Sequence, residues 1–351
     1  MSQEINALYN IGKEYDLYYA GGEDSIYNKR FGKDKTILRE KQIIKKCFHE
    51  TIKKLKFKEN LKPKTIKILD YGCGDGRIFA LLESLATFYS KFNINFEICA
   101  YDLSIVGLSN YINHLKLRHY EFKINNKILD NNSNGYLLAS MIKNNVKINF
   151  IHANPTDSIE EINKLIGEGF HINLCMFSVL SHIDTKEKRN HILQIFNKLA
   201  CKEAVSVITV PGKKMFSQEY QVYEYLRILK QKIDKYNVNN DISMHLRNFL
   251  ESLKSDGDLL YYRNDNEKFL INFCHVFNSK EFIQELQEAN LVVSKIEVLA
   301  ITYIPVLTKK SYLLNLADFI LSKFFSMKFI SSNILDKVAD QMVCVAYPSK
   351  D

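Results

Sequence analysis

Seven short runs of apolar residues, rich in Ile, Val, Phe and Tyr, recur along this chain of 351 residues. The chain has only five prolines, and each of them flanks one of these runs. Proline lacks a backbone donor and is excluded from central strands, so it marks where such strands begin or end. Continuous apolar runs are typical of strands that are buried on both faces. The seven predicted strands are TIKILDYG, FEICAYD, KINFIHAN, INLCMFSVL, AVSVITV, IEVLAITYI and MVCVAY.

Helical patterns alternate with these strands. Asp184 followed by Glu187, and Asn278 followed by Glu281, have the spacing of a capping box at the start of two of them. This alternation predicts an α/β fold: a doubly wound, seven-stranded, mostly parallel sheet with an antiparallel last strand, plus helical cap insertions.

Several segments lie outside the alternation. The first 63 residues are polar and Tyr-rich, with a helix predicted over 36–56, and the Asn-rich NNKILDNNSNG from Asn125 has the composition of an exposed loop. Two amphipathic helices are expected between 212 and 269. The predicted division is an N-terminal helical extension or lid (1–63), a ligand-binding core (64–211), a helical cap insertion (212–269), a return to the core with a helix and the sixth strand (270–305), an apolar helical insertion (306–340), and the last strand with a short tail (341–351).

The most specific motif is ILDYGCGDGR, in which three glycines fall within five residues directly after a predicted strand. In a doubly wound sheet the first turn from strand to helix lines the ligand crevice at the carboxyl ends of the strands. The spacing does not fit the dinucleotide fingerprint, because Arg77 stands where the third glycine is required, and the phosphate loop is absent. Asp70 at the end of the strand would repel a pyrophosphate and suits a cationic ligand.

Asp70, Gly72, Gly74 and Gly76 resemble the DxGxGxG motif of class I S-adenosylmethionine-dependent methyltransferases, and AYDLS from Ala100 resembles the acidic motif at the end of their second strand. The resemblance covers about 64–211, 269–305 and 341–348. It implies that S-adenosylmethionine is the cofactor, that the glycine turn holds its methionine part, and that Asp102 binds the ribose hydroxyls. HANPTD from His152 falls where the family has its adenine-contacting segment, which makes Asn154 the candidate for that contact, and CMFSVLSHI from Cys175 resembles the family's fourth-strand motif. The cofactor-binding residues that the resemblance implies are Asp70, Gly72, Cys73, Gly74, Gly76, Asp102, Leu103, Asn154 and Phe177.

Methyl transfer from a sulfonium needs an ordered acceptor and the exclusion of water more than an elaborate set of catalytic groups. A base at the mouth of the pocket would help an acceptor that must lose a proton, and histidine suits this role near neutral pH. The candidates are His182, just after the fourth strand, and His275 in NFCHVFNSKEF. The segment around His275 resembles a short pattern found in several members of the superfamily, wobble-uridine tRNA methyltransferases among them. For both histidines a purely structural role stays open.

Charge and cysteine content indicate which partners and which cellular compartment to expect. A net charge of +8 is a modest excess that favours anionic partners only weakly. The seven cysteines are an odd number without metal-ligand spacing, which favours free thiols in a reducing compartment and no metal site. The chain start lacks a secretory pattern, and no apolar run is long enough for stable membrane insertion. We therefore expect a cytoplasmic protein.

The leading interpretation is a methyltransferase acting on a small molecule in a capped pocket. Two alternatives remain: a tRNA or other RNA methyltransferase, and a partner protein that binds the cofactor without catalysis. The apolar segment 312–330 fits internal packing best, and a dimer contact or a lipid contact are its other interpretations.

Overall fold

A computed structural model of the chain describes residues 11–21, 38–55, 64–123, 136–153, 158–212, 257–265, 268–300, 336, 339 and 341–349. The predicted apolar insertion at 306–340 therefore lies outside the described residues except for Asp336 and Ala339. None of the helices described is both long enough and apolar enough to cross a membrane.

All seven predicted strands are present in one sheet. They are β1 (Lys64–Tyr71), β2 (Ile94–Asp102), β5 (Val146–His152), β6 (Phe170–Cys175), β7 (Ala200–Pro211), β10 (Leu291–Ala300) and β11 (Gln341–Pro348). Strand β1 pairs in parallel with both β2 and β6, while β11 is antiparallel to both of its neighbours, β7 and β10. The order β10-β11-β7-β6-β1-β2-β5 is thus doubly wound, with its switch point between β1 and β6.

The sheet has nine strands rather than the predicted seven, because β3 (Glu121–Lys123) and β4 (Tyr136–Lys143) extend it beyond β5. Strand β4 pairs antiparallel with β5. The hairpin turn between them contains Asn144, whose φ of 52° suits the left-handed region that asparagine tolerates. This Asn-Asn turn is the signal that the sequence interpretation missed, because it placed no strand between the Asn-rich segment and β5.

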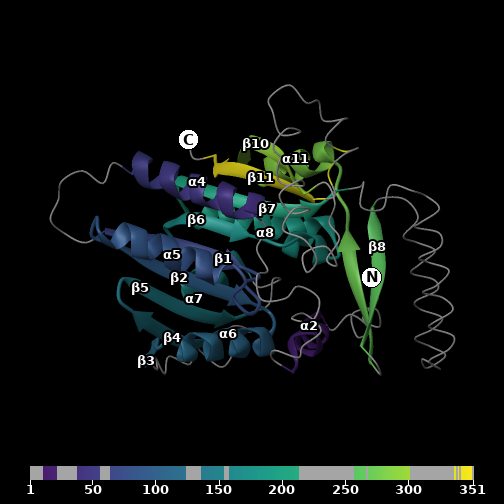
Figure 1. The fold of residues 1–351 in the computed structure, drawn as a ribbon. Helices are drawn as coiled ribbons and strands as arrows, with labels where there is room; N and C mark the ends of the chain where they lie inside the picture. The colour runs from purple at the N-terminus through teal and green to yellow at the C-terminus, as the bar shows by residue number, and fades with distance from the viewer. Residues whose placement is uncertain are drawn as a thin grey trace.

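Helices cover both faces of the sheet, so that the protein has three layers (Figure 1). On one face, α4 (Leu38–Lys54), α5 (Phe79–Ser90) and α6 (Ile105–Leu117) bury side chains such as Phe48, Leu82 and Leu108. On the other face, α7 (Ile159–Ile166), α8 (Lys186–Lys198) and α11 (Ser279–Glu288) bury side chains such as Phe196 and Phe282. Continuous burial on both faces explains why the core strands have no alternating polar pattern.

The helix starts follow the sequence signals closely. Helix α4 matches the helix predicted over 36–56. The capping box of Asn278 and Glu281 begins α11, with both of its hydrogen bonds formed. Helix α8, by contrast, is capped by Thr185, whose side chain accepts from the Lys188 N–H, and not by Asp184 as predicted. Asp184 instead pairs with Lys188.

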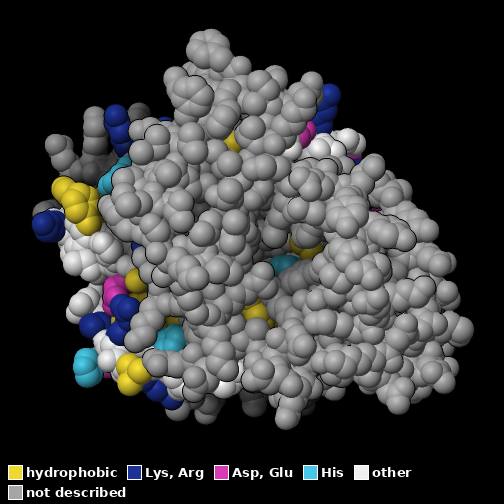
Figure 2. All heavy atoms as spheres, turned by 45° about the vertical axis from the view of Figure 1, so that its right-hand side comes forward, with side chains coloured by type: hydrophobic (Ala, Val, Ile, Leu, Met, Phe, Trp, Pro, Cys, Tyr) yellow, Lys and Arg dark blue, Asp and Glu magenta, His cyan; other side chains and the backbone are white. Residues whose placement is uncertain are grey.

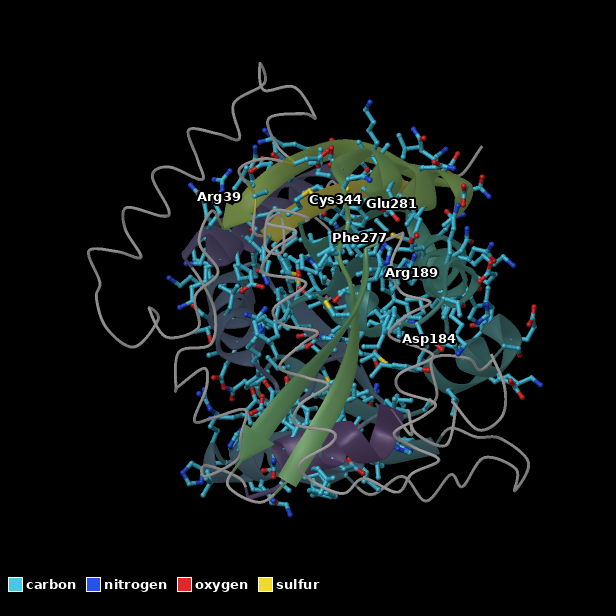
Figure 3. All side chains as sticks on the ribbon, turned by 90° about the vertical axis from the view of Figure 1, so that its right-hand side faces the viewer. Arg39, Asp184, Arg189, Phe277, Glu281 and Cys344 are labelled. Atoms are coloured by element: carbon cyan, nitrogen blue, oxygen red, sulfur yellow. The ribbon has the colours of Figure 1, made fainter. Side chains whose placement is uncertain are left out.

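The predicted cap insertion differs in structure from the expectation. Residues 213–256 lie outside the described part of the chain. The end of the predicted insertion, from Asp258, forms β8 (Asp258–Asp265), which pairs antiparallel with β9 (Lys268–His275) in a separate two-stranded sheet. Alternating apolar residues in DLLYYR and KFLINF carry that strand pattern. The hairpin lies across the carboxyl ends of the parallel strands, where β9 contacts helix α2 (Ile11–Tyr19) and the short helix η2 (Val179–His182) (Figures 1 and 3).

Candidate active site

The glycine turn between β1 and α5 is a tight loop that only glycine can form. Gly72, Gly74 and Gly76 have φ values of 72°, 56° and 82°, which ordinary side chains rarely adopt. A Cβ atom would also collide with Val179 at position 72, with Tyr19 at position 74 and with Tyr111 at position 76. The turn is therefore packed closely by α6, α2 and η2.

Four backbone amides of this turn are already paired. The N–H groups of Gly72 and Cys73 donate to the Tyr101 carbonyl, and the Gly76 N–H donates to the Cys73 carbonyl. The Gly74 N–H donates to Asp102 Oδ2 over 2.7 Å. The amides of these four residues therefore do not form a phosphate cradle, which agrees with the absence of both phosphate-binding motifs from the sequence.

Asp70 at the end of β1 is a buried carboxylate. Its Oδ2 atom has no hydrogen-bond partner among the described residues. Burial raises the pKa of Asp70 to about 7, the Arg77 charge lowers it, and the charges of Asp102 and Glu40 raise it further. An unpaired buried carboxylate is costly, and a cationic ligand would relieve that cost.

Asp102 at the end of β2 is held by backbone donors. Its Oδ1 accepts from the Ser104 N–H over 2.7 Å, while its Oδ2 accepts from Gly74. Burial raises the pKa of Asp102 to about 6, although the N–H groups of Ser104, Gly74 and Leu103 lower it, and the Asp16 carboxylate raises it. Ser104 is the N-cap of α6.

Two adjoining hollows open at the carboxyl ends of β1, β2 and β6, and we name them by their carboxylates. The Asp102 hollow is lined by Tyr15, Tyr19, Tyr71, Gly72, Tyr101, Asp102, Leu103, Val179, His182 and Ile183. The Asp70 hollow is lined by Tyr15, Tyr18, Tyr19, Asp70, Gly72, Cys73, Arg77, Ile78, Met176, Phe177, Val179 and His182. Figure 2 shows hydrophobic and histidine side chains of the described residues near the centre of this side of the molecule.

Most of the predicted cofactor residues meet in these hollows. Gly72 lines both, Asp102 and Leu103 line the first, and Asp70, Cys73 and Phe177 line the second. Burial raises the pKa of the Cys73 thiol well above its usual value, so this residue contributes packing and not a thiolate. Asn154 lies outside the described residues.

The segment after β6 brings Phe177 and His182 to the site. Phe177 and Ser178 have φ values of 60° and 64°, and two consecutive non-glycine residues in the left-handed region indicate local strain. His182 Nδ1 lies 2.9 Å from the Phe273 carbonyl oxygen. Because a carbonyl only accepts, Nδ1 carries a proton, and the neutral ring has its acceptor at Nε2.

His275 lies apart from the hollows, since it lines neither of them. It is buried, and its Nε2 lies 3.0 Å from Glu281 Oε1. Glu285, which a metal site at this position would need as a third ligand, already accepts from the Arg189 guanidinium. Arg189, Glu281 and Phe277 occupy the same region in Figure 3. The structure brings His182 to the glycine turn and does not bring His275 there.

Sequence reasoning missed several lining residues. Tyr71 and Tyr101, at the ends of β1 and β2, stack with ring centroids 4.7 Å apart. Tyr15 and Tyr19 come from α2, and the only signal for them was the tyrosine content of the N-terminal segment. Glu40 of α4 pairs with Arg77, whose guanidinium lies 4.5 Å from the centre of the Phe177 ring.

No protein-family model and no curated protein matches this sequence. Among solved structures, the chain is similar to an S-adenosylmethionine-dependent methyltransferase from Clostridium acetobutylicum (12% identity, 93% of this chain and 97% of that one, TM-score 0.48). It is also similar to the CcbJ methyltransferase from Streptomyces caelestis (9% identity, 95% and 99% covered, TM-score 0.47). A third is phosphoethanolamine N-methyltransferase 2 from Haemonchus contortus (11% identity, 97% and 61% covered, TM-score 0.43), solved with phosphomonomethylethanolamine and S-adenosylhomocysteine. This chain's own strand order and glycine turn agree with the class I methyltransferase fold that the sequence motifs resemble.

Proposed function

We propose that this chain is an S-adenosylmethionine-dependent methyltransferase that transfers a methyl group to a small-molecule acceptor in a capped pocket. The observation that carries the proposal is Asp70. This carboxylate is buried, and its Oδ2 has no partner among the described residues. It lines a hollow above a turn in which four backbone amides are already paired. Such a site favours a cationic group over a phosphate.

The residues present fit this cofactor. Asp70 would hold its amino group, and Asp102 would accept hydrogen bonds from the ribose hydroxyls, since each carboxylate oxygen has a second lone pair. Leu103 in the Asp102 hollow, and Cys73 and Phe177 in the Asp70 hollow, would supply apolar contacts. When bound, S-adenosylmethionine supplies a methyl group that is already activated on a sulfonium.

The chain's own residues then position the acceptor and exclude water. His182 lines both hollows and, with its proton held at Nδ1 by the Phe273 carbonyl, is the proposed base for an acceptor that loses a proton. The largely aromatic and aliphatic lining supports a small acceptor with an apolar body. The proposed catalytic role of His275 would require it to act from outside the described hollows.

A methyl-transfer screen tests the proposal. The protein is incubated with methyl-labelled S-adenosylmethionine and a cell extract, which is then separated into small-molecule, RNA and protein fractions. Label in the small-molecule fraction supports the proposal. Tight cofactor binding without transfer to any fraction would favour the non-catalytic alternative.

An RNA acceptor is the second candidate because the exposed face of α4 carries a row of lysines, among them Lys45, Lys46 and Lys53. Lysines on one helix face can contact the phosphate backbone. If RNA is the acceptor, label enters the RNA fraction, and RNA affinity falls steeply as salt rises.

A further inference from the structure

Asp16, on helix α2, caps a second helix from a distant part of the sequence. Its Oδ1 accepts from the Ser104 hydroxyl over 2.7 Å and from the Val106 N–H over 3.1 Å. Both donors lie at the N-terminus of α6, where the first N–H groups have no partner within the helix and the helix dipole favours a negative charge. Asp16 therefore fastens α2 to α6.

This contact continues to the glycine turn. Ser104 accepts from the Gly107 N–H over 3.0 Å and donates its own N–H to Asp102, which in turn holds the Gly74 N–H. A single hydrogen-bonded path therefore connects α2 with the proposed ribose-binding carboxylate and with the turn itself.

Helix α2 also packs closely against α6 at Gly107. A Cβ atom at Gly107 would lie 3.2 Å from the Tyr19 ring and 3.3 Å from the Gly74 carbonyl carbon. Glycine inside a helix is unfavourable, and here its bare Cα leaves room for the tyrosine. The Asn110 side chain donates to the Tyr19 carbonyl over 2.9 Å and holds the end of α2 in place.

The docked helix forms a wall of both hollows, to which it contributes Tyr15 and Tyr19. Tyr15 also meets the His182 ring edge-on, at 5.8 Å between centroids. We propose that Asp16 is a positioning residue whose two hydrogen bonds to the start of α6 hold α2 closed over the crevice, and we call these two bonds the latch. Release of bound cofactor or its product then requires the latch to break. The part concerning the cofactor rests on the proposed function.

Hydrogen exchange of the ligand-free protein tests the latch without any cofactor. Asp16→Ala is expected to speed exchange of the α2 amides about tenfold, because the two hydrogen bonds to α6 are lost. Asp16→Asn retains an acceptor oxygen and should recover most of the protection. Leu17→Ala, on the same helix and 39% exposed, is the matched control and should exchange like the wild type. Unchanged exchange in Asp16→Ala overturns the proposal.

Release of radiolabelled S-adenosylhomocysteine, chased with unlabelled compound, tests whether the contact made by Asp16 controls the dissociation rate of the ligand. Asp16→Ala is expected to raise the dissociation rate about tenfold and to change the association rate much less. Ser104→Ala should act in the same direction. Ser109→Ala should not, because among the described residues the Ser109 hydroxyl bonds only to the Ile105 carbonyl of its own helix.

The two experiments separate the two proposals. Faster exchange of α2 with an unchanged dissociation rate contradicts the latch, because α2 would then open without releasing the ligand. A wild-type protein that binds no S-adenosylhomocysteine contradicts the proposed function, and the exchange comparison still decides whether Asp16 fastens α2.

Discussion

Replacing Asp70 by Asn should stabilise the ligand-free protein at alkaline pH and at the same time weaken its binding of S-adenosylhomocysteine. Burial raises the pKa of Asp70 from 3.8 to about 7, so the folded protein keeps this proton up to about neutral pH, whereas the unfolded chain releases it near pH 4. Stability is therefore lost as pH rises from about 4 to about 7. Above pH 7, ionisation of the buried Asp70 lowers the free energy of unfolding by about 4 kcal/mol in total, because each pH unit between the two pKa values contributes about 1.4 kcal/mol.

Between pH 5 and pH 8, the wild type should lose roughly 2–3 kcal/mol of stability that Asp70→Asn does not lose. The buried amide of the variant costs about 1–3 kcal/mol, but this cost is the same at every pH and cancels from the comparison. Burial also raises the pKa of Asp102, but Asp102 is present in both proteins, so its contribution to the pH dependence cancels as well. The assay is urea unfolding followed by circular dichroism at pH 5 and at pH 8.

The same variant should bind S-adenosylhomocysteine at least tenfold more weakly, because a hydrogen bond to a charged group is worth about 1.5–3 kcal/mol. A substitution that stabilises the fold but weakens ligand binding indicates that the carboxylate serves binding and not stability. The reasoning is refuted if the stability difference between variant and wild type stays constant with pH.

Three further variants test Asp102, the two candidate histidines and the buried Arg189–Glu285 ion pair. Asp102→Asn leaves one backbone N–H facing an amide NH2 group, so affinity for S-adenosylhomocysteine should fall about 10–100-fold in calorimetry. His182→Ala should lower kcat by roughly 10²-fold or more with little change in cofactor affinity, and an equal loss in His275→Ala alone would transfer the role of base to His275. Arg189→Met leaves the buried Glu285 carboxylate without its partner and should cost about 3–5 kcal/mol in urea unfolding, whereas a cost below about 1 kcal/mol would show that the pair is not needed.

The core of the fold could be predicted because its signals are local. The apolar runs that end at Asp70 and Asp102 became adjacent parallel strands, since such runs can only be buried between two helical layers. The glycine turn was predictable because each glycine meets a backbone requirement that no other residue meets. The β3–β4 extension was missed because β4 lies between an Asn-rich stretch and an asparagine turn, and residues of this kind are typical of loops.

The parts of the site that come from outside the core could not be predicted from local patterns. Asp16 meets Ser104 across 88 positions, and no periodicity or spacing indicates such a contact. Tyr15 and Tyr19 belong to a polar segment in which tyrosine has many ordinary explanations. The alternating pattern of β8 can be recognised, but the helical signals earlier in the predicted insertion 212–269 led to a helical prediction for that segment, and no strand was predicted at β9.

The central claim is that the crevice above the glycine turn binds S-adenosylmethionine through two carboxylates. Isothermal titration of the wild type, Asp70→Asn and Asp102→Asn with S-adenosylmethionine tests it most directly, with ATP and NAD as control ligands. The account predicts one site per chain in the wild type, weakened at least tenfold in each variant, and no binding of either control. Equal affinity in all three proteins, or a preference for ATP or NAD, would contradict it.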